Sequence, residues 1–346
     1  MKSNCRALPS IRRFVRLVSL AALLITAGNA AAEQVPAANI SLRLKWFIYS
    51  SFAHHLVAEE KGLFAAEGLK VDIRPGGVGI DPIKSVAVGE DDLGLASYGQ
   101  ILLARQHGIP VVAIAEEYVS SGVVFLALKS SGITSPKQFV GKKIGWIPGS
   151  DTATVYQALM AKEGVDRKSL QEVSIGADLA PFLAGTIDVW TAGYISNQPI
   201  VAEMKGYPVN VIDPHDYGID VGGNVVFVSE ETLRTKRPQI EAFIRAMLKS
   251  IETARDMPAA EVVDIVLKYN PNLKRDSEIK VWEVTKDRLL SKDPATAGVM
   301  KKETWTSTAS VFHEFGELKN IPGLESVYTN DVVLAAHASK VKVAEK

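Results

Sequence analysis

The stretch that decides the fold is residues 40–76, ISLRLKWFIYSSFAHHLVAEEKGLFAAEGLKVDIRPG. Two segments in it, 40–44 and 69–73, alternate apolar and polar residues, which is typical of half-buried strands. Between them, residues 52–67 have the apolar spacing of a helix, and Gly68 is expected to end it. A strand, a helix and a second strand of these lengths form a βαβ unit, so the stretch predicts a mostly parallel sheet.

The same alternation continues toward the C-terminus and then starts again. Two further strands, 92–96 and 111–115, and two further helices, 82–88 and 98–107, complete the first series. A second series begins at Ser135, the expected N-cap of a helix that has Pro136 at its first position. Its strands are predicted at 143–147, 171–175, 188–192 and 209–212, and after residue 229 the pattern is helical to about residue 305.

Two apolar segments, 123–128 and 224–228, lie at the edges of the second series. A chain that leaves one α/β unit, builds another and returns must cross between them twice, and these segments are the expected crossings. We therefore predict an α/β fold of two doubly wound lobes joined by two hinge strands. The expected ranges are 38–128 and 224–335 for the first lobe, 129–223 for the second and 336–346 for a polar tail. Because ligands of open α/β sheets bind outside the carboxyl ends of the strands, the site is expected in a cleft between the lobes.

The N-terminal region reads as a secretory signal peptide. Five basic residues precede a short apolar run, 17–25, and the small residues Ala30-Ala31-Ala32 precede Glu33. The apolar run is shorter than the roughly 20 residues that a membrane span needs, which weighs against the alternative of an uncleaved anchor. We expect residues 1–32 to be removed and the mature chain to be periplasmic.

The composition of the expected mature chain excludes several classes of function. The only cysteine, Cys5, lies in the expected signal peptide, so no disulfide, thiolate nucleophile or cysteine-bound metal is available afterwards. The first 32 residues hold five basic and no acidic residues of a chain with 39 of each, so their removal leaves a net charge of about −5. This balance gives no support for nucleic-acid binding. We expect a monomer.

Several motifs resemble those of a known family. LRLKWF at 42–47, EKGLF at 60–64 and EGL at 67–69 resemble the opening of periplasmic solute-binding proteins for thiamine pyrimidine precursors. The relatives of those proteins bind taurine, alkanesulfonates, nitrate and riboflavin. Further matches are PGG at 75–77, DDLG at 91–94, GIPVV at 108–112 and KKIG at 142–145.

The resemblance covers residues 40 to about 332 and implies a type II periplasmic binding protein fold. It also implies a small-molecule ligand, an ABC importer permease as partner, no cofactor and no catalytic activity. Two alternatives stay open. Some fungal thiamine-pyrimidine synthases share the fold, but they resemble one another in a cysteine-rich iron motif that a cysteine-free mature chain lacks. A sensor that presents its ligand to a membrane receptor would carry the same sequence features as an importer component.

Candidate ligand contacts in the first lobe follow the predicted strands. Trp46 and Tyr49 come after the first strand, where aromatic side chains can stack on a planar ligand. His54 replaces a small residue that is frequent in the resembling proteins, and it is a candidate either for a hydrogen bond to the ligand or for a surface histidine. The adjacent pair His54 and His55 does not have zinc spacing on a helix, so we expect no metal. Four further contacts are expected at the carboxyl ends of strands, namely Ser97, Tyr98, Glu116 and Tyr118, whereas Glu117 is expected in solvent.

The second lobe offers two clusters. Ser150 and Thr152 lie between a strand and a helix, where hydroxyls and backbone N–H groups suit an anion or a carbonyl, although Asp151 would repel an anion. Ser150 also fits as an N-cap. Asp188, Tyr194, Asn197 and Gln198 form the second cluster, and Asn224 is expected where the chain returns to the first lobe.

The second cluster bears on the identity of the ligand. The resembling pyrimidine binders often have Asn-Glu-Pro where this chain has Asn197-Gln198-Pro199, so the charge that would pair with an aminopyrimidine is missing there. We expect a small planar heterocycle in an interlobe cleft, with riboflavin, an alkanesulfonate or taurine as alternatives.

Overall fold

The computed structural model describes residues 37–344. The expected signal peptide lies outside the described residues, so its prediction stands untested. None of the helices in the described part combines the length and the hydropathy that a membrane span requires.

The first of two five-stranded sheets has the strand order β2-β1-β3-β10-β4. Its strands are β1 (Ala38–Arg43), β2 (Leu69–Arg74), β3 (Leu93–Ser97), β4 (Val111–Glu116) and β10 (Asn224–Ser229). The βαβ prediction is confirmed, because β1 is parallel to both β2 and β3. β10 is antiparallel to β3 and β4, since it enters the sheet from the other lobe.

The second sheet has the order β7-β6-β8-β5-β9. Its strands are β5 (Val123–Leu128), β6 (Lys143–Trp146), β7 (Gln171–Ser174), β8 (Val189–Tyr194) and β9 (Val209–Ile212). β6 is parallel to β7 and β8, whereas β5 is antiparallel to β8 and β9. The two-sheet α/β architecture agrees with the fold class predicted from the sequence.

The two segments expected to cross between the lobes are interior strands, one in each sheet. β5 pairs along its length with β8 and β9, and β10 pairs with β3 and β4. Both are interior strands whose residues are almost all buried, so each needs hydrogen-bonded neighbours on both edges. The connections between the sheets are the segments 117–122 and 213–223, called here the first and second crossing. Residues 123–128, expected in the first lobe, therefore belong to the second.

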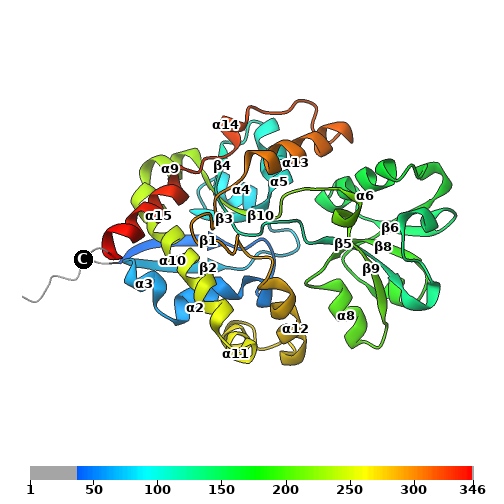
Figure 1. Cartoon of the computed structure of the whole chain (residues 1–346), viewed down its shortest axis with the longest axis horizontal. Helices are drawn as coiled ribbons and strands as arrows, with labels where there is room; N and C mark the ends of the chain where they lie inside the picture. Colours follow the sequence, from blue (N-terminus) through cyan, green and yellow to red (C-terminus); the bar gives the residue numbers. More distant parts are fainter. Residues whose placement is uncertain (1–36, 345–346) are drawn as a thin grey trace, which may run out of the picture. The chain divides into compact units, whose positions relative to one another are not determined.

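Helices cover both faces of each sheet (Figure 1). α2 (Ala53–Glu60), α3 (Leu63–Ala66), α10 (Arg237–Asp256), α11 (Ala259–Tyr269) and α12 (Arg275–Thr285) share one hydrophobic core with the first sheet. On its other face lie α4 (Pro82–Ala87), α5 (Tyr98–Gln106), α13 (Lys302–Glu314) and α14 (Leu324–Val327). The second sheet has α6 (Asp151–Lys162) on one face and α7 (Ala180–Leu183) and α8 (Gln198–Met204) on the other. α9 (Glu230–Thr235) directly follows β10.

Two helix predictions need correction. The helix expected over residues 52–67 is divided into α2 and α3, because Gly62 adopts a left-handed conformation with φ of 68° between them. Residues 336–344 of the expected polar tail belong to α15 (Asp331–Ala344). Val332, Val333 and Ala336 of this helix are fully buried in the first core, where they pack the helix onto the lobe.

The DDLG motif ties the edge of the first sheet together. Asp91 is almost fully buried, and its carboxylate accepts from Arg43 at 2.7 Å and from Arg74 at 3.0 Å. Asp92 accepts from the backbone N–H of Ser41 at 3.0 Å. These contacts join β1 and β2 to the turn before β3, so the motif holds three neighbouring strands of the first sheet in place.

Candidate ligand-binding site

A cavity of about 600 Å³ lies between the two lobes. Its wall is built from segments at the carboxyl ends of β1, β2, β6 and β8, together with both crossings and the start of β10. This is where the sequence placed the ligand, because the carboxyl ends of parallel strands leave open backbone groups and loops at one edge of a sheet.

Nine of the residues expected from the sequence line this cavity. They are Trp46, Tyr49, Tyr118, Ser150, Thr152, Tyr194, Asn197, Gln198 and Asn224. Lining the cavity places these side chains where a ligand would contact them; which of them bind is a question for the variants described below.

Trp46 is held at the cavity by the PGG motif. The backbone N–H of Gly76 donates to the Trp46 carbonyl at 2.9 Å, which brings the loop after β2 against the end of β1. A Cβ on Gly76 would lie 2.4 Å from the Leu44 carbonyl oxygen, so only glycine allows this approach. The Trp46 side chain is 36% exposed and meets Phe47 edge to face at 5.3 Å. A partly exposed aromatic ring on a cavity wall is suited to stacking on a flat ligand.

An ion pair that the sequence did not predict joins the lobes across the cavity. The Lys45 ammonium lies 3.4 Å from the Asp151 carboxylate and 3.4 Å from the Asn224 side-chain oxygen. The Tyr194 hydroxyl donates to both carboxylate oxygens of Asp151, at 3.1 and 3.2 Å. Lys45 and Asp151 side chains are each only 18% exposed.

The electrostatics of this cluster keep Asp151 ionised. Burial alone would raise the pKa of its carboxyl, but the charge of Lys45 and the hydrogen bonds from Tyr194 and Lys45 outweigh it and lower the pKa. Burial and the nearby Asp151 charge raise the pKa of Tyr194 well above its ordinary value. The cavity therefore contains a carboxylate, an ammonium and a neutral phenol within contact of one another.

The loop before α6 is organised mainly by capping. The Ser150 hydroxyl accepts from the Ala153 N–H at 3.1 Å and donates to the Ile147 carbonyl at 2.7 Å, as expected for an N-cap. On the other side, the Gln198 side-chain oxygen accepts from the Tyr194 N–H at 2.8 Å. The Asn197 side chain makes no capping bond. Asn197 and Gln198 line the cavity together with Asp151.

Four predicted contacts lie away from the cavity and are not retained. Ser97 caps α5 through a capping box with Gln100. Tyr98 is fully buried, packs on Trp305 at 4.2 Å and donates to Glu116 at 2.8 Å. Glu116 is itself buried beneath the sheet, which raises its pKa. Asp188 accepts from the Lys143 N–H at 2.8 Å and holds two strands together. Each lies near a strand end, but its side chain serves the fold.

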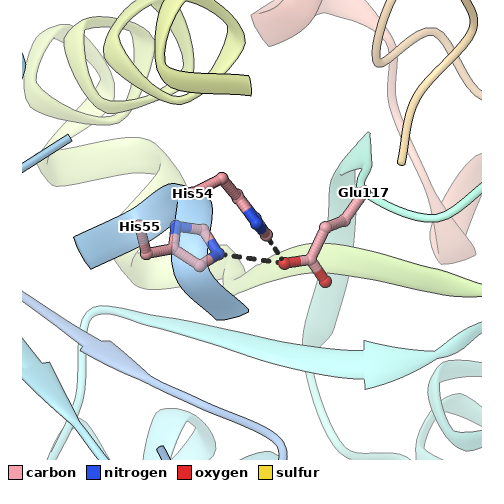
Figure 2. A group of neighbouring side chains, drawn as sticks. All are labelled: His54, His55 and Glu117. Atoms are coloured by element: carbon pink, nitrogen blue, oxygen red, sulfur yellow. Dashed lines mark hydrogen bonds and ion pairs between the residues drawn. The ribbon is translucent and has the colours of Figure 1, made fainter. Parts of the chain in front are cut away.

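His54 also lies outside the cavity wall, in a buried cluster with His55 and Glu117 (Figure 2). The Nε2 atoms of His54 and His55 lie 3.0 and 2.9 Å from the same Glu117 oxygen. Glu117, expected in solvent, has no exposed surface. The sequence missed this because the first crossing turns beneath α2 and takes the Glu117 side chain inward.

Several other residues that line the cavity were not predicted from the sequence. Arg288 follows α12 and reaches both crossings, with Nη2 3.5 Å from the Asp213 carboxylate and Nη1 3.4 Å from the Ser121 carbonyl. Trp190 lines the cavity from within β8 although its side chain is fully buried. Lys45 was the one residue with a usable signal, since it directly precedes Trp46 at the end of the first strand.

Relatives named for different functions match this chain. A formylaminopyrimidine-binding protein of Halalkalibacterium halodurans is 28% identical over 69% of this chain and 73% of its own. The riboflavin-binding protein RibY of Chloroflexus aurantiacus is 25% identical over 93% of this chain and 97% of its own. A protein of Legionella pneumophila named 4-amino-5-hydroxymethyl-2-methylpyrimidine phosphate synthase is 24% identical over 71% of this chain and 78% of its own. Binding proteins and a named enzyme thus share this sequence pattern.

A solved structure and a family model also match this chain. The periplasmic aliphatic sulphonate binding protein SsuA of Escherichia coli matches with a TM-score of 0.67 and 16% identity, covering 83% of this chain and 91% of that one. At this identity the match supports the two-lobed fold alone. The family model described as NMT1/THI5 like matches residues 50–261, from the start of the first helical region into α11. The chain belongs to the NMT1/THI5-like family.

Proposed function

We propose that this chain is the solute-binding component of an ABC importer and captures a small planar heterocycle, such as a thiamine pyrimidine precursor, between its lobes. The observation that carries the proposal is the composition of the cavity. Trp46 from the first lobe and Tyr194 from the second provide aromatic side chains, and Asp151 provides an ionised carboxylate. The partner is a membrane permease, and the protein acts in the periplasm after export as a monomer.

Asp151 supplies the negative charge that Gln198 lacks. An aminopyrimidine presents an amino group beside a ring nitrogen, and when that nitrogen is protonated both N–H groups can donate charge-assisted hydrogen bonds to a carboxylate. Gln198 does not provide that charge, but Asp151 lines the same cavity and is ionised. Gln198 and Asn197 would then contact the remaining polar atoms of the ring. The name of the Halalkalibacterium halodurans relative points to the same ligand class.

Riboflavin is the second candidate, because the relative that spans nearly the whole chain is named for it and a cavity of about 600 Å³ is within the range of ligand pockets. An alkanesulfonate or taurine is less favoured, since the Asp151 carboxylate would face the sulfonate. We propose binding without catalysis: no cysteine-rich iron motif is available in the expected mature chain. A sensor role would use the same cavity, and the genes beside this one would distinguish it.

The direct test is to identify the ligand. Native mass spectrometry of the purified protein should show a co-purifying solute of heterocycle mass. Calorimetric titration with a formylaminopyrimidine, an aminopyrimidine alcohol, riboflavin and an alkanesulfonate should then give one preferred class. Tightest binding of the sulfonate would contradict the proposal.

Replacing Trp46 with alanine tests the stacking contact. Stacking of a base on an aromatic side chain contributes about 1–3 kcal/mol, so Trp46→Ala should weaken binding by roughly tenfold to a hundredfold. The melting temperature without ligand should hardly change, because Trp46 is 36% exposed and lies outside the hydrophobic core clusters of the described residues. Phe47→Ala is the matched control, since Phe47 neighbours Trp46 but does not line the cavity. If Trp46→Ala lowered the melting temperature strongly and left the affinity unchanged, Trp46 would be a packing residue.

Ligand binding should close the lobes. The two sheets are connected by only two crossings, 117–122 and 213–223, and a ligand that contacts Trp46 and Tyr194 together favours the closed form. Small-angle X-ray scattering should therefore give a smaller radius of gyration at saturation than without ligand. An unchanged radius at saturation would indicate a rigid cleft.

A further inference from the structure

A cluster of three potential metal ligands lies beside the cavity, outside the ligand site. His54 and His55 begin α2, and Glu117 begins the first crossing more than 60 residues later. Figure 2 shows both imidazoles directed at one carboxylate oxygen. All three side chains have no exposed surface. The two histidines alone lack zinc spacing on a helix, but Glu117, the third potential ligand, comes from another element.

The ligand atoms are spaced nearly as around one ion. The two Nε2 atoms lie 3.0 and 2.9 Å from the Glu117 oxygen, and the three potential ligand atoms all fall within 4.8 Å of one another. Ligand atoms about 2.05 Å from a zinc ion lie roughly 3.0–3.4 Å apart at angles of about 95–110°. Small side-chain rotations would therefore admit an ion. The second Glu117 oxygen has no hydrogen-bond partner among the described residues and supplies a fourth ligand atom.

No protonation state of the three side chains gives every buried polar atom of the cluster a hydrogen-bond partner among the described residues. An imidazolium donates from both ring nitrogens, but neither the His54 nor the His55 Nδ1 has a partner among the described residues. Neutral imidazoles leave the charge of Glu117 buried, and no Lys or Arg of the described part pairs with it. Arg255 lies close enough to affect His54, but its guanidinium donates to the backbone carbonyls of Lys286 and Leu290.

We propose that His54, His55 and Glu117 form a buried binding site for one divalent transition-metal ion, and zinc is the ion to test. Imidazole and carboxylate ligands suit zinc, and a site closed to solvent has the character of a structural rather than a catalytic site. The ion would fasten the start of α2 to the first crossing. Ser51 and Phe52 lie three and two residues before His54 in the chain, Tyr118 directly follows Glu117, and all three line the ligand cavity.

The hydrogen-bond partners of the two Nδ1 atoms determine the metal affinity that we expect. A histidine that binds metal through Nε2 carries a proton on Nδ1, and protein partners normally accept it. Here each Nδ1–H would need a buried water, because no described residue reaches it. Loss of such partners typically weakens metal binding by about 10–100-fold, so we expect moderate affinity and a site that chelators empty.

The test uses untagged protein, freed of metal with a chelator and titrated with Zn²⁺. Plasma mass spectrometry after gel filtration should find about one zinc per chain, and the melting temperature should rise by about 5 °C at a hundredfold excess over Kd. Glu117→Gln should lose this rise and bind zinc more than about a hundredfold more weakly, since it removes a ligand and not merely an outer partner. His215→Gln is the control, because His215 is an exposed imidazole 4.0 Å from Asp220, and it should behave as the wild type.

Zinc K-edge X-ray absorption of the wild-type protein provides a readout that does not depend on the variant folding. Two imidazoles and carboxylate oxygens around the ion would support the site. The proposal is overturned if the wild type retains no zinc, if the spectrum shows an ion without imidazole ligands, or if Glu117→Gln binds and is stabilised as the wild type is.

Discussion

Asp151→Asn is expected to weaken ligand binding by about thirtyfold or more. The substitution keeps the shape of the side chain and removes its charge, so the ligand loses a charge-assisted hydrogen bond and the Lys45 ammonium on the facing lobe loses its charged partner. Truncating one member of a hydrogen-bonded, buried charge pair at an interface costs about 2–5 kcal/mol, and about 1.4 kcal/mol corresponds to tenfold in affinity. Calorimetric titration with the ligand identified by mass spectrometry would measure the change.

Two comparisons make this result specific. Asp216→Asn removes an equally charged but exposed side chain of the second crossing and should leave affinity unchanged. The wild-type affinity should also be stable on mild acidification. Because the folded pKa of Asp151 lies below its ordinary value, its contribution is present above that ordinary value and is lost only as the pH falls through the lowered one. Unchanged binding by Asp151→Asn would remove the carboxylate from the proposed site and favour a ligand without an amidine-like edge.

The fold was largely predictable because its local patterns agree with its tertiary structure. The alternation at residues 40–44 and 69–73 marks two strands that pair in register along their whole length. The assignment of Val123–Leu128 to a hinge failed for a physical reason. An apolar run of six residues predicts that the segment is buried. It does not predict which strands accept and donate the hydrogen bonds of its backbone, and here those strands are β8 and β9.

The site was predictable at the level of strand ends and less so at the level of side chains. Trp46 follows a strand, Tyr194 ends a strand, and both line the cavity. Tyr98 also follows a strand, but its side chain is buried in the core. The direction of a side chain at a helix start depends on what packs against it, here Trp305 from more than 200 residues away. Pairs such as Lys45 with Asp151, and His54 with Glu117, depend on how distant elements are brought together, which no local pattern contains.

Gly223→Ala is expected to destabilise the protein by about 3 kcal/mol, at the upper end of what overpacking usually costs. Gly223 ends the second crossing and lies against the first. A Cβ at this position would be 2.4 Å from the Tyr118 carbonyl oxygen and 2.6 Å from the Ser120 carbonyl oxygen. Both atoms belong to backbone, which cannot turn aside as a side chain would, so the two crossings must move apart. Thermal denaturation should show a melting temperature lower by about 5–10 °C.

Gly122→Ala provides the matched control for this prediction. Gly122 ends the first crossing and also lines the cavity, but its added Cβ would meet only Tyr194 and Ile195 side-chain atoms, at 3.7 and 3.8 Å. Both substitutions restrict the unfolded chain to the same extent, so the difference between them isolates the clash in the folded state. Gly223→Ala should also bind ligand more weakly, because displaced crossings shift Asn224 and Tyr118 relative to the second lobe. Equal melting temperatures for the two variants would mean that the crossings separate freely, and the close approach of their backbones would then contribute nothing to holding the cavity in shape.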